Sequence, residues 1–375
     1  MRAVVRDSAG IRIIDNPGPA LATVLGWTLS KTPSLDIGGA EPDDVNLFEV
    51  NGAIRFADGR IVLANNGSQE LVFFGKEGDV ITRTGGTGGG PGEFSAISWI
   101  AATPDDSIVA WDARQDRLSV FTADGTYTRT FRLNPHEGAG RVRVRGMMED
   151  GTLIVAASNI GDLPPSGVIR PDERVMRYDL DGEFTSDLGT FPSQAFYLQA
   201  TREAVSIFPA TFSRSTSYDA GNGHVYAGNN DHSEVHLMSM DGDLITIVRL
   251  ELEPVQVTPT LLSAYQSRTA AGAPTAQARQ QITEAFNQIP VPETLPAYGR
   301  ILMDEEGFLW VEQYTPHPAD PKKAMVFDAE GVALGSLELP GSFTVHQIGT
   351  DFILGLWRDD LDVEHVLMYD LNRVP

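Results

Sequence analysis

Asp-Gly and Glu-Gly pairs recur along this 375-residue chain, and they lie between short apolar segments. Tight β-hairpin turns require positive φ angles, which Gly adopts without strain and Asp tolerates. Such pairs therefore predict consecutive antiparallel hairpins. They begin at Asp58, Glu77, Asp124, Asp150, Asp181, Asp241, Glu306 and Glu330.

The segments between the turns recur in a fixed order. The first copy has strands expected at 61–64, 71–74 and 80–83, and the second has them at 108–111, 118–121 and 127–131. Four more copies bring the number to six. A four-stranded unit of about 45 residues is the period of propeller blades. The sequence thus predicts an all-β fold, a six-bladed β-propeller of four-stranded antiparallel blades. The central strands of the other four copies are expected at 153–156 and 175–178, 225–227 and 235–238, 308–311 and 324–327, and 352–356 and 366–369.

Residues 1–375 are expected to form one domain whose ring closes through its N-terminal segment. The last copy lacks an outermost strand, whereas segment 1–50 offers spare strands at 10–15 and 34–37. One of these is expected to complete the final blade. A second departure from the repeat, residues 258–297, has apolar residues at helical spacing on both sides of residues 272–274. It predicts two short helices inserted between blades.

The formal net charge of -23, with 51 acidic and 28 basic residues, indicates a solvated acidic surface. Nucleic acid is not expected as a partner, because phosphate binding needs clustered Lys and Arg. No stretch approaches the roughly 18 apolar residues of a membrane span. The absence of Cys excludes disulfides and thiolate zinc sites. Met1 is not followed by a signal-peptide core.

A glycine cluster at residues 85–92 invites comparison with phosphate-binding loops. It lacks the Lys-Ser/Thr of a P-loop, and the segment after it is typical of a strand rather than a helix. The preferred interpretation is a connection between blades that needs unusual backbone angles, anchored by Glu93 and Phe94.

The same segment, Gly85 to Phe94, resembles one found in a broad group of bacterial six-bladed propellers related to NHL-repeat and TolB-like proteins. Three further segments, 5–13, 307–311 and 355–360, resemble exported members of that group from Gemmatimonadota and similar bacteria. The resemblance extends over nearly the whole chain. It implies the fold, and it implies export by a signal or lipid-anchor segment upstream of Met1. It implies no reaction, because most of the group has no assigned activity.

Three elaborations are expected on one face of the ring: loops 158–174 and 313–323, and the helical insertion. Connections between blades and loops between second and third strands emerge on the same face, so the three should gather beside the channel entrance. Repeat scaffolds commonly build binding sites in this way, although the helices could instead merely cover apolar blade edges. Candidate ligand-binding residues on this face are Asn65, Asn66, Asp112, Arg114, Asn229, Asp231, Tyr314, His317, Trp357 and Arg358.

The first hypothesis for function is an exported, periplasmic or extracellular module that binds a protein, small molecule or carbohydrate through this face. The second is a metal-dependent hydrolase, lactonase or lyase with a divalent ion at the channel mouth. The third is a structural subunit of a larger assembly. No cofactor is predicted, but Ca²⁺ at the central channel is left open, as is a cytoplasmic location.

Overall fold

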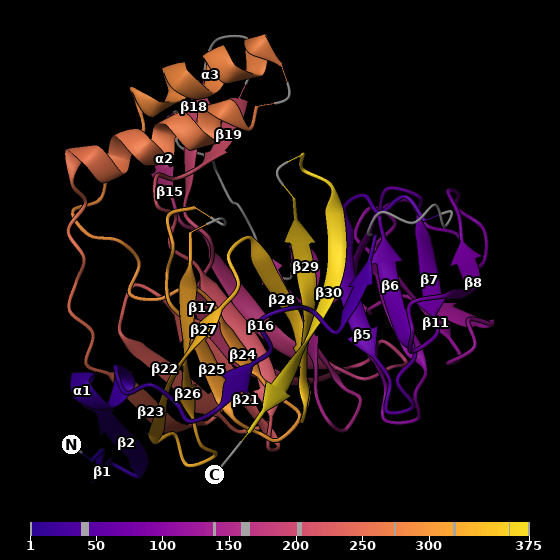
Figure 1. Ribbon diagram of the computed structural model, residues 1–375, viewed down its shortest axis with the longest axis horizontal. Helices are drawn as coiled ribbons and strands as arrows, with labels where there is room; N and C mark the ends of the chain where they lie inside the picture. The colour runs from indigo at the N-terminus through magenta and orange to yellow at the C-terminus, as the bar shows by residue number, and fades with distance from the viewer. Residues whose placement is uncertain are drawn as a thin grey trace.

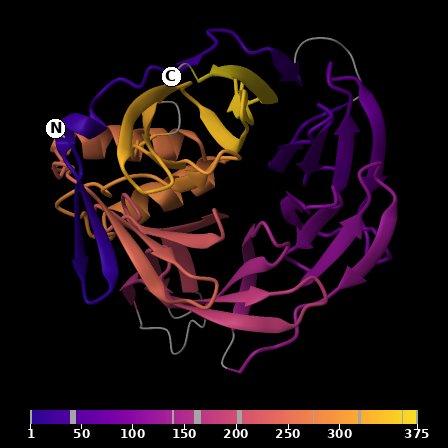
Figure 2. The same ribbon diagram turned by 90° about the horizontal axis from the view of Figure 1, so that it is seen from below.

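The computed structural model describes residues 2–38, 45–137, 140–158, 166–200, 205–273, 275–317, 320–359 and 361–373. Pro274, parts of the predicted loops at 159–165 and 318–319, and Asp360 lie outside these ranges. Six sheets, whose blade strands pair antiparallel, stand side by side in a ring, seen end-on in Figure 2. The molecule is a six-bladed β-propeller, as predicted.

Each blade contains four strands; in blades 1 to 5 the innermost strand comes first along the chain, whereas the outermost strand of blade 6 comes from the N-terminal segment. Blade 1 contains β5 (Val50–Arg55), β6 (Ile61–Asn65), β7 (Glu70–Phe74) and β8 (Val80–Gly85), and blade 2 contains β9 (Ile97–Ala102), β10 (Ile108–Asp112), β11 (Arg117–Phe121) and β12 (Tyr127–Phe131). Blade 3 contains β13 (Arg141–Met147), β14 (Leu153–Ser158), β16 (Asp172–Tyr178) and β17 (Phe184–Pro192), and blade 4 contains β20 (Thr216–Gly221), β21 (His224–Asn229), β22 (Glu234–Met238) and β23 (Leu244–Leu250). Blade 5 contains β24 (Ile301–Met303), β25 (Leu309–Glu312), β26 (Lys322–Phe327) and β27 (Ala333–Leu339), and blade 6 contains β28 (Phe343–Ile348), β29 (Phe352–Arg358), β30 (Glu364–Asn372) and β4 (Leu35–Ile37).

The hairpin turns have the predicted chemistry. Gly59, Gly125 and Gly151 adopt φ angles of +91°, +85° and +82° directly after an Asp. The strands between the turns bury continuous apolar runs, because each blade packs against a neighbour on both faces. These two features together place the central strands of all six blades where the repeat predicts them.

Ring closure depends on β4, which pairs with β30 through Asp36 and Leu367. Leu35 and Ile37 are buried in the core shared by blades 6 and 1. The other candidate, β2 (Ile11–Asn16), instead pairs in parallel with β23 of blade 4, and β1 (Val4–Ser8) adds a strand outside it. Of the two spare strands, the second therefore completes the last blade.

Between β2 and β4 the chain runs along the outside of the ring. After α1 (Gly18–Leu21), the backbone N–H of Leu25 donates to Ser336 of blade 5, and β3 (Thr28–Leu29) pairs with β30. The N-terminal segment thus contacts blades 4, 5 and 6 in turn (Figure 2).

A cap rises from one face of the ring (Figure 1). It contains a small sheet of β15 (Ser166–Ile169), β18 (Phe196–Ala200) and β19 (Val205–Pro209), packed against α2 (Pro259–Ala271) and α3 (Ala276–Phe286). Thr258 and Thr275 cap the two helices by accepting backbone N–H groups. The helices match the predicted insertion, whereas the sheet was not predicted. Neither helix, nor any other in the part of the chain described, is long and apolar enough to cross a membrane.

The helical insertion contacts two other segments of this face, one of which is the predicted loop 313–323. Phe212, in the connection to blade 4, lies 4.6 Å from Tyr265 of α2 between ring centroids. Arg268 of α2 forms an ion pair of 2.8 Å with Asp320 in the loop of blade 5. The opposite face carries the first hairpin turns and the outer turns of the blades.

Candidate functional site

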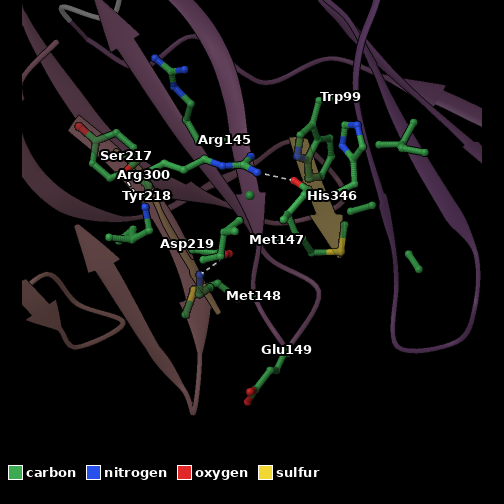
Figure 3. Close-up of a pocket in the computed structure, with 18 of the residues that line it drawn as sticks. Trp99, Arg145, Met147, Met148, Glu149, Ser217, Tyr218, Asp219, Arg300 and His346 are labelled. Carbon is green, nitrogen blue, oxygen red and sulfur yellow. Dashed lines mark hydrogen bonds between the residues drawn. The ribbon is translucent and has the colours of Figure 1, made fainter. Parts of the chain in front are cut away.

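A cavity of about 640 Å³ occupies the central channel of the ring. Its walls are the inner strands β9, β13, β20, β24 and β28, which belong to five different blades. Figure 3 shows the side chains that converge on it. We call the end where inner strands begin the entrance half, and the end where they turn into the first hairpin the hairpin half.

Strand register decides which side chains face the channel. Ala53, Ile100 and Val144 lie opposite the third residue of their neighbouring strand, Val345 lies opposite the fourth, and all four are buried. Residues one position away alternate to the other side. In the entrance half, Trp99, Ser217 and Arg300 line the cavity. Two positions further toward the hairpins, Ala101, Asp219 and Leu302 line it, and so does Gly146 of β13.

Two further channel residues, Arg145 and His346, are presented by β-bulges. The register of β13 shifts between Val144 and Gly146, and that of β28 shifts between Val345 and Gln347. Each shift leaves one residue unpaired, and a bulge of this kind redirects a side chain. Blades 3 and 6 lie opposite each other in the six-membered ring, so the two bulges face the channel from opposite sides.

Arg145 extends from its bulge toward the entrance half. Its Nη2 donates to the Oε2 of Glu173 over 3.0 Å, and the Glu173 side chain is only 3% exposed. Burial, together with the charge of Glu173, raises the pKa of the neighbouring Tyr218 phenol. Within the described chain, Arg145 Nε, Glu173 Oε1 and Tyr218 Oη are buried without hydrogen-bond partners. The wall between blades 3 and 4 therefore holds a buried carboxylate beside a neutral phenol.

Arg300 reaches from blade 5 to the neighbouring blade 6 (Figure 3). Its Nη2 donates to the Val345 carbonyl over 2.6 Å and lies 3.3 Å from the Oε1 of Glu312. The other carboxylate oxygen of Glu312 lies 3.5 Å from Lys322 Nζ. Although burial acts to raise it, Arg300 and Lys322 hold the pKa of Glu312 below its usual value.

Two titratable groups of the channel have strongly shifted pKa values. Burial raises the pKa of Asp219 to about 6, against the opposing effect of N–H groups from Met303 and Ala220. Burial lowers the pKa of His346 to about 4, and the charge of Arg300 acts in the same direction. At neutral pH Asp219 is therefore mostly ionised and His346 is neutral, with its Nε2 buried and unpartnered in the described structure.

Four of the predicted candidate residues lie at the ends of second strands or just after them, in blades 1 and 2. Asn65 Oδ1 accepts the N–H of Phe48, and Asn66 donates to Glu49. Asp112 is 1% exposed and accepts backbone N–H groups from the incoming connection and its own loop. Arg114 is exposed beside it. The polar atoms of Asn65 and Asp112 thus tie the connection between blades to the second strand.

The other six candidates are spread over blades 4, 5 and 6. Asp231 pairs with Arg170 and Arg214, and Asn229 accepts from Arg170. Arg358 pairs with the buried Glu364 over 2.6 Å. None of the ten lines the channel cavity described above. A ligand-binding role for them stays a prediction. Tyr314 lines a smaller cavity of about 310 Å³, His317 is half-buried in the same loop, and Trp357 packs edge-on against His365.

The glycine segment has the structural role preferred from sequence. Arg117, itself 9% exposed, donates to the carbonyls of Gly89, Gly90 and Glu93. The Glu93 carboxylate accepts the N–H of Gly90 over 2.7 Å, and Phe94 is fully buried. The expected anchors, Glu93 and Phe94, are confirmed, and Arg117 is a third anchor that the sequence did not reveal.

In the described ranges no three His, Asp or Glu residues lie close enough to hold a metal ion together. Ca²⁺ at the channel stays an untested expectation. Sequence reasoning placed candidates on the loops and missed Trp99, Arg145, Ser217, Asp219, Arg300 and His346. One signal was present: the alternation Arg141-Val142-Arg143-Val144-Arg145 puts Arg side chains on one side of an inner strand.

Comparisons with known proteins agree with this fold. Residues 41–137 match the model of a family described as a six-bladed β-propeller. A search of curated proteins finds no significant match. A candidate exported protein from Bacteroides fragilis is 14% identical, with a TM-score of 0.53 over 97% of this chain and 100% of its own. A member of the DUF4221 family from Bacteroides vulgatus is 12% identical, with a TM-score of 0.50 over 93% of this chain and 99% of its own.

Proposed function

We propose that this protein is an exported binding module that holds a small polar ligand in its central channel. The observation that carries the proposal is the cavity of about 640 Å³, into which five blades direct side chains. Small-molecule sites are concave, typically about 300–1,000 Å³, and combine apolar walls with a few converging polar groups. The channel has both features.

The apolar and polar groups of the channel come from separate blades. Trp99 and Leu302 offer apolar surface, whereas Ser217, Asp219 and Arg300 offer hydrogen-bonding groups. Trp99 also supplies a flat ring on which a planar or sugar-like ligand could stack. The bulge residues Arg145 and His346 also line the cavity, and Arg145 Nε and His346 Nε2 have no hydrogen-bond partner within the described protein. Such a set can orient one ligand from several directions.

Export is supported by the likeness of the fold to a candidate exported protein of Bacteroides fragilis and by the resemblance of the glycine segment to exported propellers. A periplasmic or extracellular location also accords with an acidic, Cys-free chain, although neither property requires it. Expression of the full-length gene product followed by cell fractionation tests this part of the proposal.

A variant that blocks the channel tests the binding site. Ala101 lines the cavity with a small side chain, so Ala101→Trp fills space without changing charge. A fragment screen by saturation-transfer NMR should yield small polar ligands that bind the wild type and lose binding to this variant. Ala276→Trp, at the exposed start of α3, is the matched control.

Retention of every fragment by the Ala101→Trp variant would place binding elsewhere and refute the channel site. Thermal melting of both variants verifies that the ring is intact, so that a loss of binding is assigned to the blocked cavity rather than to unfolding.

A further inference from the structure

We infer that the protein has a second small-molecule site, separate from the central channel, that takes an uncharged apolar molecule. The site is the cavity of about 310 Å³ that Tyr314 lines, which we call the side cavity. In the described chain it shares no lining residue with the channel cavity. Its volume lies at the lower end of the roughly 300–1,000 Å³ that is typical of small-molecule sites.

The walls of the side cavity come from three parts of the chain that meet beside blade 5. They are α1, the two segments that lead into and out of the helical insertion, and the strands β25, β26 and β27 with the loop after β25. The N–H of Gly18 donates to the Glu251 carboxylate over 2.9 Å, which joins α1 to the first of these segments. The N–H of Leu25 donates to the Ser336 carbonyl over 2.9 Å, and the N–H of Ser336 donates to the Thr23 carbonyl over 2.7 Å. These bonds fix the chain after α1 against blade 5.

The side cavity is a gap at the edge of the hydrophobic core between blades 4 and 5. Leu21 and Met325 line the cavity and belong to this core. Leu252 and Ala297 also line it and pack against the same core, but they are only partly buried. Apolar surface of the core is therefore left uncovered inside the cavity. An apolar molecule that fills the gap would remove this surface from water, which is the main favourable contribution to binding of this kind.

Backbone groups in the walls are already bonded to one another. The N–H of Leu295 donates to the Val255 carbonyl over 2.9 Å, and the N–H of Gln313 donates to the Lys323 carbonyl over 2.7 Å. An extended peptide that joined these walls would need their N–H and carbonyl groups to be free. The bonding therefore favours a ligand held by apolar contacts over a peptide strand.

The charged side chains of the lining favour an uncharged ligand. Glu253 and Lys323 are both exposed to solvent, and Lys323 Nζ lies 3.6 Å from the carboxylate of Glu338. Burial raises the pKa of the Tyr314 phenol, which keeps this side chain neutral. Charges in water outside the cavity contribute little to holding an ion within it. The ligand is therefore an uncharged apolar molecule about the size of one or two rings.

Crystals pressurised with xenon test the character of the side cavity directly. Xenon enters apolar cavities, and X-ray diffraction locates it without knowledge of the natural ligand. We expect a xenon atom beside Leu21, Leu252 and Met325. A side cavity without xenon would overturn the inference.

Cyclohexanol and inositol test the chemistry of the ligand, because they share a carbocyclic ring and differ in the number of hydroxyl groups. Cyclohexanol should raise the melting temperature and slow hydrogen exchange at the N–H groups of Leu25, Leu295 and Ser336, which belong to the cavity walls or flank them. Inositol should do neither. Equal effects of the two compounds on these N–H groups would overturn the inference.

A variant that fills the side cavity tests its location. Ala297→Phe adds a ring to the lining, and it should weaken the binding of phenylnaphthylamine, an uncharged apolar fluorescent dye, by about tenfold. Ala264→Phe adds the same ring at an exposed position of α2 and is the matched control, which should leave the affinity unchanged. The xenon and exchange experiments use the wild type, so they do not depend on the folding of either variant.

The outcomes also separate the side cavity from the channel. Loss of dye binding in Ala101→Trp but not in Ala297→Phe would place the dye in the channel, which overturns this inference and leaves the proposed function standing. If no fragment binds the channel while xenon and cyclohexanol occupy the side cavity, the proposed function fails and the second site remains.

Discussion

Arg145 on the bulge of β13 and Glu173 at the start of β16 form an ion pair of 3.0 Å that joins the channel wall to the interior of blade 3. The carboxylate is almost fully buried, whereas the guanidinium is one-third exposed. Removing the arginine alone leaves a buried charge without compensation.

We predict that Arg145→Gln destabilises the protein by about 3 kcal/mol, the usual cost of breaking a buried ion pair from one side. The double variant Arg145→Gln/Glu173→Gln should lose less than this single variant, because no uncompensated charge remains. Urea unfolding of the wild type, both single variants and the double variant measures the difference. Equal losses in the single and double variants would show that the pair does not act as a unit.

The glycine segment offers a comparison of two adjacent positions. Gly85 and Gly86 adopt φ angles of +113° and +112°, so Ala is strained equally at both. A Cβ on Gly85 would lie 2.7 Å from the Gln69 carbonyl, whereas one on Gly86 meets nothing within 4 Å. We predict that Gly85→Ala lowers stability more than Gly86→Ala, by roughly 1–3 kcal/mol. Thermal melting of both variants tests this. Similar losses of stability would mean that backbone strain alone, and not the close contact with Gln69, destabilises the variants.

Asp219 should make stability depend on pH. Its pKa in the folded protein is raised to about 6 from an ordinary 3.8. Between about pH 4 and pH 6 the Asp219 carboxyl therefore holds a proton in the folded protein but not in the unfolded chain. The free energy of unfolding falls as the pH rises through this range. We predict that Asp219→Asn is more stable than the wild type above pH 6, and that the difference shrinks toward pH 4. Chemical unfolding at several pH values measures it.

His346 should contribute with the opposite sign. Its pKa in the folded protein is lowered to about 4 from 6.5, so the unfolded state takes up a proton first as the pH falls. The contribution of the neutral His346 to stability is present above pH 6.5 and lost toward pH 4. His346→Gln removes this dependence. A wild type and variant whose stabilities run parallel from pH 7 to pH 4 would contradict the prediction.

Closure of the ring by β4 can be tested with two buried isoleucines. Ile37 of β4 lies in the core between blades 6 and 1, and Ile13 of β2 lies outside blade 4. Ile37→Ala should cost about 2–5 kcal/mol and speed hydrogen exchange in both β5 and β30. Ile13→Ala is the control, and it should leave exchange in those two strands unchanged. Equal acceleration by both variants would show that β4 has no special part in closure.

The repeat was predictable because its signals are local. Asp58-Gly59 and its counterparts encode turns within a few residues, and the buried runs between them encode strands. The small sheet of β15, β18 and β19 was not predicted, because β15 pairs with β18 across two strands of blade 3, and no Asp-Gly or Glu-Gly pair lies between β18 and β19. Nor could the sequence show whether β2 or β4 completes blade 6, since both are short apolar strands. Only the closed ring determines which sheet edge each strand pairs with.

The channel residues were harder to predict for a different reason. A bulge shifts the side-chain alternation by one residue, and nothing in the letters around Arg145 or His346 marks the shift. Polar residues at strand ends, such as Asp112, were easier to recognise. The Asp112 carboxylate accepts backbone N–H groups from the preceding connection between blades.

The pairing of β4 with β30 also sets the order in which the molecule can be completed during synthesis. Asp36 emerges from the ribosome long before Leu367, its partner in the register. More than 300 residues must be translated while the first strands wait with exposed backbone groups and apolar side chains, a state prone to misassociation. The nascent chain would therefore gain from an escort that shields its beginning until the last blade is made.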